Sequence, residues 1–226
     1  RPVVIGPISG LPKPSGIQRV AVDPDNPNSS SVIEAARVIE QVGLVGLPTE
    51  TFYALAANGL NRRAVDRVLR AKGRPDGKPL GLLLADRNMI EMVTTNIPPF
   101  AIALIEEFWP GPLSLILDAK EDLPKGVLGE GNSVSVRVPG CRLATEVTRQ
   151  ARVPLTATSA NRTGTNPPKT PEDVIRNLGE HLDLVLEAGE TPGGLPSTMV
   201  DVREKKPVLI REGAIPWGKI VTLLPN

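Results

Sequence analysis

Two basic side chains, Lys72 and Arg74, stand two positions apart in the stretch RAKGRPDGK, where Gly73 and Pro75 are expected to hold them in a loop beyond the helix end. Arginine offers a planar fork of donors and lysine a compact point charge, and together they suit the oxygens of a polyphosphate. Seven basic residues lie from Arg62 to Lys78, against two acidic ones. The alternative is a solvated helix face whose basic residues complement the C-terminal end of the helix dipole.

The segment GLPTETFYALAAN, residues 46–58, runs from a short apolar stretch directly into Pro48, Thr49, Glu50 and Thr51. Strand ends are where open α/β sheets bind their ligands. Two hydroxyls and a carboxylate at such an end can hold a small polar substrate. The alternative is a turn with a helix cap, because Thr, Glu and Pro are common where helices begin.

The stretch SVSVRVP alternates between polar and apolar residues, which is typical of a strand with one buried face. Its valines are expected to face the core. The polar residues then share the other face: Ser133, Ser135 and Arg137. This face is either the floor of a polar cleft, with Arg137 ready for a carboxylate, or an ordinary solvent-exposed surface.

The stretch TSANRTG follows another apolar run, and it contains Ser159 and Asn161. Their small polar side chains can bond phosphate or ribose, although Asn and Gly also favour a simple turn. Near the C-terminus, Ser197 begins one expected strand and Arg211 ends another.

Several catalytic signatures are missing from the sequence. There is no G-x-x-x-x-G-K-[ST] loop, no G-x-G-x-x-G after a strand, no H-E-x-x-H and no G-x-S-x-G. The only cysteine is Cys141 and the only histidine is His181, so zinc sites built from these types are not expected. A thiol–imidazole pair is also not expected, because the two residues fall on separate helices. Cys141 is predicted to be packed and His181 to lie at the surface.

Apolar periodicity predicts the elements that carry these side chains. Helices are expected over residues 31–42, 62–71, 88–95, 98–109 and 142–151, and again after Thr170. Strands are expected over residues 44–47, 80–85, 113–119, 133–138, 155–159, 184–187, 198–202 and 208–211. Three helix starts carry local signals. Ser31 and Glu34 have capping-box spacing, Asn61 precedes the second helix, and Pro171 follows Thr170.

The alternation of these elements indicates an α/β domain with a mixed sheet. Residues 1–28 are proline-rich and are expected to form an extended arm, with one edge strand near residues 18–22. Residues 29–226 are expected to form a single domain.

The composition and net charge limit which binding partners and which cellular compartment are expected. The 226 residues have a formal net charge of +1, so no global basic field points to nucleic acid or membrane. A single cysteine excludes a disulfide framework within the chain and favours a reducing, cytoplasmic setting. No apolar run approaches the length of a membrane span.

Taken in order, the motifs resemble the YrdC/Sua5 family of threonylcarbamoyl-AMP synthases. The family's K-x-R…S-x-N signature appears as Lys72-Gly73-Arg74 and Ser159-Ala160-Asn161. The other matching stretches are PTET (48–51), WPGPL (109–113), V-R-x-P (136–139) and the Ser197-Thr198 pair. The resemblance runs from about Ser31 to Gly213. The chain is similar to the short form of the family. It implies an open, twisted mixed sheet flanked by helices, with a concave basic cleft.

The resemblance also implies a reaction and its site. A nucleotidyltransferase would form L-threonylcarbamoyl-AMP and pyrophosphate from ATP, L-threonine and bicarbonate or CO2, usually with Mg²⁺. The product would pass to a tRNA threonylcarbamoyl transferase for N6-threonylcarbamoyladenosine (t6A) modification. ATP contacts are implied for Arg74, Lys78, Ser133, Ser159, Asn161 and Arg211, with Lys72 and Arg74 as the catalytic pair. Threonine contacts are implied for Thr51, Arg137 and Ser197. Some members place a histidine where this chain has Leu83.

Three alternatives remain. Relatives such as the YciO branch and the carbamoyl-transferring HypF domain share the cleft, so a related carbamoyl-adenylate enzyme is one. The second is a regulatory nucleotide sensor with an inactive site, which the presence of both Lys72 and Arg74 disfavours.

The third alternative is an RNA-binding protein without catalysis. Aromatic residues make up only 3% of the chain, so stacking platforms for bases are scarce. Naked tRNA is expected to bind weakly and without specificity, because the implied substrate is a nucleotide and not the polymer.

Overall fold

The computed structural model describes residues 16–73 and 77–224. Its α-helices are α1 (Ser29–Glu40), α2 (Arg62–Lys72), α3 (Pro99–Phe108), α4 (Arg142–Ala151), α5 (Pro171–Leu178) and α6 (Trp217–Val221). Short 3-10 helices are η1 (Arg87–Met92), η2 (Lys125–Val127) and η3 (Gly179–His181). The helix expected over residues 88–95 is thus the 3-10 helix η1, and α6 was not predicted.

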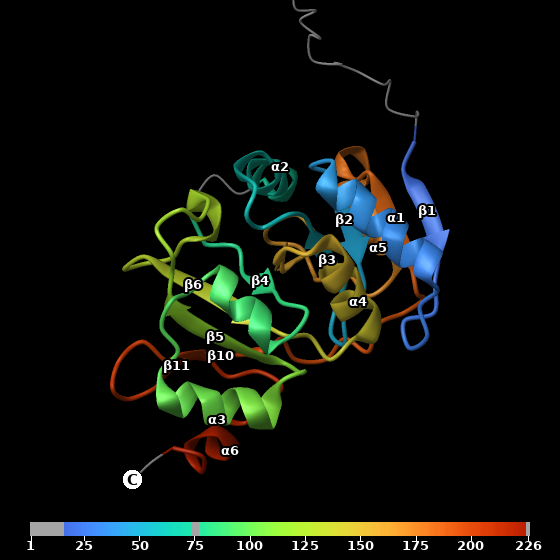
Figure 1. Cartoon of the computed structure of the whole chain (residues 1–226). Coiled ribbons are helices and arrows are strands. Elements are labelled where there is room, and N and C mark those ends of the chain that lie inside the picture. The colour runs from blue at the N-terminus through green and yellow to red at the C-terminus, as the bar shows by residue number, and fades with distance from the viewer. Residues whose placement is uncertain (1–15, 74–76, 225–226) are drawn as a thin grey trace, which may run out of the picture.

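The strands divide between two sheets (Figure 1). The five-stranded sheet has the order β1 (Gln18–Ala21), β9 (Leu184–Glu187), β2 (Val45–Leu47), β3 (Ala54–Ala56) and β8 (Thr158–Ser159). The six-stranded sheet has the order β11 (Val208–Arg211), β10 (Thr198–Asp201), β5 (Leu113–Asp118), β6 (Ser133–Arg137), β4 (Leu82–Leu83) and β7 (Leu155–Thr156). Each sheet holds parallel and antiparallel pairs, which confirms the mixed α/β class. The edge strand expected near residues 18–22 is β1.

One expected strand, residues 155–159, belongs to both sheets. Its first part, β7, pairs antiparallel with β4, and its second part, β8, pairs antiparallel with β3. Ala157 stands between them and donates its backbone N–H to Gly81 at 2.8 Å. Apolar patterning predicts a single strand here, because a change of sheet leaves no trace in the sequence of so short a run.

Two other local predictions are wrong. The cap of α1 is Asn28, whose side chain accepts from the N–H of Ser31 at 2.8 Å, so Ser31 and Glu34 form no capping box. The segment after β2 begins no helix. It turns back as β3, which pairs antiparallel with β2 over Leu47↔Ala54 to Val45↔Ala56. A tertiary partner, β8, covers the other edge of β3, and local helix-start preferences cannot compete with that pairing.

Other helix starts follow local chemistry. Asn61 accepts from the N–H of Ala64 at 3.1 Å, and Thr170 accepts from that of Asp173 at 3.2 Å, with Pro171 in the first turn. The cap at Asn61 and the helix start at Pro171 were predicted. Gly73 ends α2 in the left-handed conformation, with φ 60°, as glycine readily does.

Two apolar clusters support the sheets. The smaller one joins α1 and α4 to one face of the five-stranded sheet, and includes Ile39, Val45, Val147 and Leu184. The larger one joins both sheets to α2, α3 and α5 and includes Val68, Leu104, Val136 and Val174. In Figure 1, α1 crosses in front of β2, while α3 lies beside β5 and β10. Within the described part of the chain, no helix combines the length and the apolar character needed to cross a membrane.

The hydroxyl of Thr198 fastens the segment after β11 to the start of β10. It accepts the N–H groups of Gly213 and Ile215 at 2.9 and 3.0 Å and donates to the carbonyl of Ile215 at 2.6 Å. Thr198 is fully buried. A Cβ on Gly213 would lie 2.1 Å from the carbonyl oxygen of Pro196, so a side chain there would force the two segments apart.

We expect Thr198→Val to lower the free energy of unfolding by about 2–4 kcal/mol, because two buried N–H groups and a carbonyl lose their partner. Thr198→Ser keeps the hydroxyl and should retain most of the stability. Urea titrations followed by circular dichroism measure both. Equal stability of the Val and Ser variants would contradict this role of the hydroxyl.

Candidate functional site

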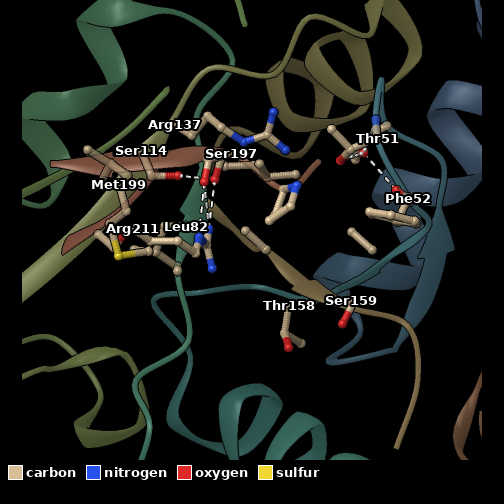
Figure 2. A pocket seen from close by; sticks show the side chains of 18 of the residues that line it. Thr51, Phe52, Leu82, Ser114, Arg137, Thr158, Ser159, Ser197, Met199 and Arg211 are labelled. Atoms are coloured by element: carbon tan, nitrogen blue, oxygen red, sulfur yellow. Dashed lines mark hydrogen bonds between the residues drawn. The ribbon is translucent and has the colours of Figure 1, made fainter. Parts of the chain in front are cut away.

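A cavity of about 450 Å³ opens where the two sheets meet. Its walls come from the turn after β2, from β4, β6 and β8, and from the ends of β10 and β11. Figure 2 shows the lining side chains, with Thr51 and Phe52 on one side and Ser114, Met199 and Arg211 on the other. Residues from segments far apart in the sequence therefore face one space.

The structure brings together the residues that the family resemblance assigns to threonine. Thr51, Arg137 and Ser197 all line the cavity. The alternation predicted for β6 holds, because its valines are buried while Ser135 and Arg137 face the cavity. The interpretation of this face as ordinary solvent-exposed surface is wrong, since Arg137 is 8% exposed.

Thr51 is held by the turn that contains it. The hydroxyl of Thr49 donates to the carbonyl of Phe52 at 2.6 Å and accepts the N–H of Thr51 at 3.2 Å. The two threonine hydroxyls lie 3.1 Å apart. Thr49 is buried and Thr51 is half-buried, so Thr49 shapes the turn and Thr51 presents its hydroxyl to the cavity.

Arg137 is paired within the protein. Its Nη1 donates to Oε1 of Glu50 and, at 3.5 Å, to the carbonyl of Gly111. Its Nε and Nη2 make no hydrogen bond to the described residues, which leaves one edge of the guanidinium for an anionic ligand. A planar fork of two donors suits a carboxylate.

Arg211 and Ser197 are in direct contact at the opposite side of the cavity (Figure 2). Arg211 donates to the carbonyl of Ser197 at 2.9 Å and to its hydroxyl at 3.1 Å. The hydroxyls of Ser197 and Ser114 lie 2.8 Å apart. Burial, together with the positive charge of Arg137, lowers the pKa of Arg211 below the ordinary value for arginine. Two cations thus face one cavity, and a ligand with negative charge would relieve their repulsion.

The family model described as Sua5_yciO_yrdC: Telomere recombination matches residues 37–213, more than half of the chain. The chain belongs to the Sua5/YciO/YrdC family. A Pyrococcus abyssi protein named Threonylcarbamoyl-AMP synthase is 37% identical over 186 residues, which are 82% of this chain and 55% of that protein. A Nitrosococcus oceani protein of the same name is 32% identical over 169 residues, which are 75% of this chain and 91% of that protein.

A solved structure of a family member has the same fold. Pyrococcus abyssi Sua5 complexed with L-threonine superposes with a TM-score of 0.86 at 34% identity, over 91% of this chain and 60% of that one. This chain therefore spans little more than half the length of its Pyrococcus relative, while it spans most of the Nitrosococcus one.

The K-x-R…S-x-N signature of the family is partly a structural clamp in this chain. Lys72 is 3% exposed and is the last residue of α2, not part of a loop beyond it as predicted. Its Nζ donates to the carbonyl of Ser159 at 2.6 Å and to Oδ1 of Asn161 at 3.3 Å. Asn161 in turn donates to the carbonyl of Thr165 at 2.7 Å. Of these three residues only Ser159 lines the cavity.

Two further residues assigned to ATP lie outside the cavity wall, and a third is not described. Lys78 is exposed and lies outside the lining, and Ser133 is buried at the start of β6, two residues before Ser135. Arg74 lies outside the described residues. The basic face expected on α2 is divided. Arg67 pairs with Asp183 at 3.0 Å and donates to the carbonyl of Val42, while Arg62, Arg63 and Arg70 are exposed.

Sequence reasoning missed several lining residues: Ser114, Phe52, Thr158, Pro196 and Met199. Ser114 sits in the strand LSLILD, where one polar residue among apolar ones was the available signal. Leu83, where some members carry histidine, also lines the cavity and is fully buried.

Cys141 and His181 take no part in the site. Cys141 is buried at the start of α4, and burial raises the pKa of its thiol. His181 is partly exposed in η3, beside Glu180. A packed cysteine and a surface histidine were predicted. Among the described residues, no group of three or more His, Cys, Asp or Glu side chains could hold a metal ion.

We expect Lys72→Met to lower the free energy of unfolding by about 1–3 kcal/mol, because the Ser159 carbonyl and the Asn161 side chain lose a charged donor. Lys205→Met makes the same change at an exposed site and should leave stability within about 0.5 kcal/mol. Thermal melts of the three proteins provide the measurement. If Lys72→Met has the melting temperature of the wild type but no turnover, Lys72 acts on the ligand and does not stabilise the S-x-N turn.

Proposed function

We propose that this chain forms L-threonylcarbamoyl-AMP and pyrophosphate from ATP, L-threonine and bicarbonate or CO2, in the pathway to t6A in tRNA. The supporting observation is one cavity that unites Thr51, Arg137 and Ser197 with Ser159 and Arg211. The names of the Pyrococcus and Nitrosococcus relatives and the threonine complex of Sua5 support the same reaction. We keep a single catalytic domain over residues 29–226, an N-terminal arm over 1–28 and a cytoplasmic setting as parts of this proposal.

The contact between Arg211 and Ser197 supports a reaction that joins two ligands. Ser197 is assigned to threonine and Arg211 to ATP, and the two side chains are hydrogen-bonded to each other. Two substrates held by these residues would therefore meet at this point. A bond between threonine and the nucleotide needs such a meeting.

The chemistry requires positioning and positive charge from this chain. The threonine amine takes up CO2 to give a carbamate and releases a proton. A carbamate oxygen then attacks the α-phosphorus of ATP, and the bond to pyrophosphate breaks. Arg137 would orient the threonine carboxylate, and Arg211 would stabilise negative charge at the phosphate. No protein nucleophile is needed, as in phosphoryl transfer generally.

The described lining of this cavity offers no carboxylate ligand for Mg²⁺. The cation prefers oxygen ligands, mostly carboxylates, phosphates and water. Among the described residues, the lining contains no Asp or Glu, and Glu50 behind it pairs with Arg137. The residues present do not fit a protein-held Mg²⁺, and no step is assigned to one.

The RNA-binding alternative receives less support. The cavity is lined with hydroxyls and two arginines and has one aromatic side chain, Phe52, whereas single-stranded RNA is usually held on several aromatic rings. We propose that naked tRNA binds only weakly and that a separate transferase uses the product.

We expect pyrophosphate release from ATP that depends on both L-threonine and bicarbonate. Valine and 2-aminobutyrate should be used at least about 100-fold less well, because a site that bonds a substrate hydroxyl rejects analogues without it. A coupled pyrophosphate assay with each component omitted in turn is the measurement. Release that is independent of threonine would instead favour a related carbamoyl-adenylate enzyme.

We expect Arg137→Ala to raise the Michaelis constant for threonine roughly 10- to 150-fold, the equivalent of one charged hydrogen-bond pair, while that for ATP changes less than about threefold. Arg137→Lys should restore little, because a point charge does not reproduce the fork. A shift confined to the ATP constant would show that Arg137 serves the nucleotide.

A further inference from the structure

Glu50 has a carboxylate placed behind the cavity wall. Its side chain is 20% exposed and is not part of the lining. Oε1 accepts from Nη1 of Arg137, and Oε2 is buried with no hydrogen-bond partner among the described residues. A buried carboxylate with one unsatisfied oxygen is costly, and such groups are usually kept for a function.

Gly140 lies beside this carboxylate. A Cβ built on Gly140 would lie 3.5 Å from Cγ and 3.6 Å from Cδ of Glu50, and 3.6 Å from Cα of Gly111. Gly111 itself is fixed by donating its N–H to the carbonyl of Val138 at 2.8 Å. These are ordinary contact distances, so Gly140 lies close beside the carboxylate while Oε1 is directed to Arg137 by their hydrogen bond.

The charges explain why Arg137 needs this partner. Arg137 and Arg211 face the same cavity, and the charge of Arg137 contributes to the lowered pKa of Arg211. Among the described residues, no carboxylate other than that of Glu50 pairs with either arginine. Glu50 therefore offsets one of two like charges and draws the guanidinium of Arg137 toward the turn that carries Thr51.

We propose that Glu50 is a positioning residue that acts through Arg137. Glu50 accepts the hydrogen bond from Nη1 of Arg137. The other edge of the guanidinium, formed by Nε and Nη2, is then presented to the carboxylate of the amino-acid substrate. This inference rests on the proposed function, because it takes an amino acid as the ligand of Arg137. It assigns a role to the glutamate of the turn, which touches no substrate itself.

A double-mutant cycle tests this role. The proteins are the wild type, Glu50→Gln, Arg137→Ala and the double variant, with Michaelis constants measured for threonine and for ATP. Glu50→Gln keeps the shape and removes the charge, and it should raise the threonine constant about tenfold while the ATP constant changes less than about threefold. The double variant should be no worse for threonine than Arg137→Ala alone, because Glu50 has no effect once its partner is gone.

Two further variants serve as controls. Glu50→Asp keeps the charge and should recover part of the affinity for threonine. Glu107→Gln makes the same chemical change at an exposed glutamate outside the cavity and should behave as the wild type. If Glu50→Gln fails to fold, Glu50→Asp alone decides, because a shift confined to the threonine constant still supports positioning.

Multiplying effects in the double variant, or equal changes in both Michaelis constants, would overturn the proposal. A crystal structure of unliganded Glu50→Gln separates this result from a failure of the proposed function. Arg137 should adopt a different rotamer there, and an unchanged rotamer would also overturn the positioning role. If the wild type shows no threonine-dependent turnover but Arg137 does move, the proposed reaction is wrong and the positioning of Arg137 by Glu50 stands.

Discussion

The site depends on one extended segment, residues 155–159, that is hydrogen-bonded into both sheets. β7 pairs with β4 and β8 pairs with β3, with Ala157 between them. Each pairing covers only two residues, so the junction needs reinforcement. Lys72 provides it by binding the carbonyl of Ser159 from the end of α2. The cavity lies along this junction, and its two sides belong to different sheets.

Charge is distributed unevenly across that junction. Arg137 is neutralised by Glu50, whereas Arg211 pairs only with the carbonyl and hydroxyl of Ser197 among the described residues. One side of the cavity is therefore close to neutral and the other is cationic. This asymmetry fits a ligand with a single carboxylate on the Arg137 side and a more highly charged group near Arg211.

Several features that depend on neighbours in sequence were predicted, although the cap of α1 at Asn28 was not. The cap at Asn61, the helix start at Pro171 and the alternation of β6 all follow from interactions within a few residues. The position of Arg137 was therefore predictable, because its direction is fixed by the pleat of its own strand. Features that depend on distant partners were not. The hairpin β2–β3, the division of the strands between two sheets and the burial of Lys72 each need contacts with segments more than 70 residues away.

By itself, the sequence determined the mixed α/β class, the family and the set of polar residues at strand ends, because local pattern and motif order carry that information. Only the tertiary structure decided which of these residues face one cavity and which are used in holding it together. Thr51, Arg137, Ser159, Ser197 and Arg211 line it. Lys72, Asn161, Thr198 and Glu50 support it from behind. The type of a charged or polar residue does not show whether its side chain binds a ligand or another side chain. Its partners come within hydrogen-bond distance only when the chain folds.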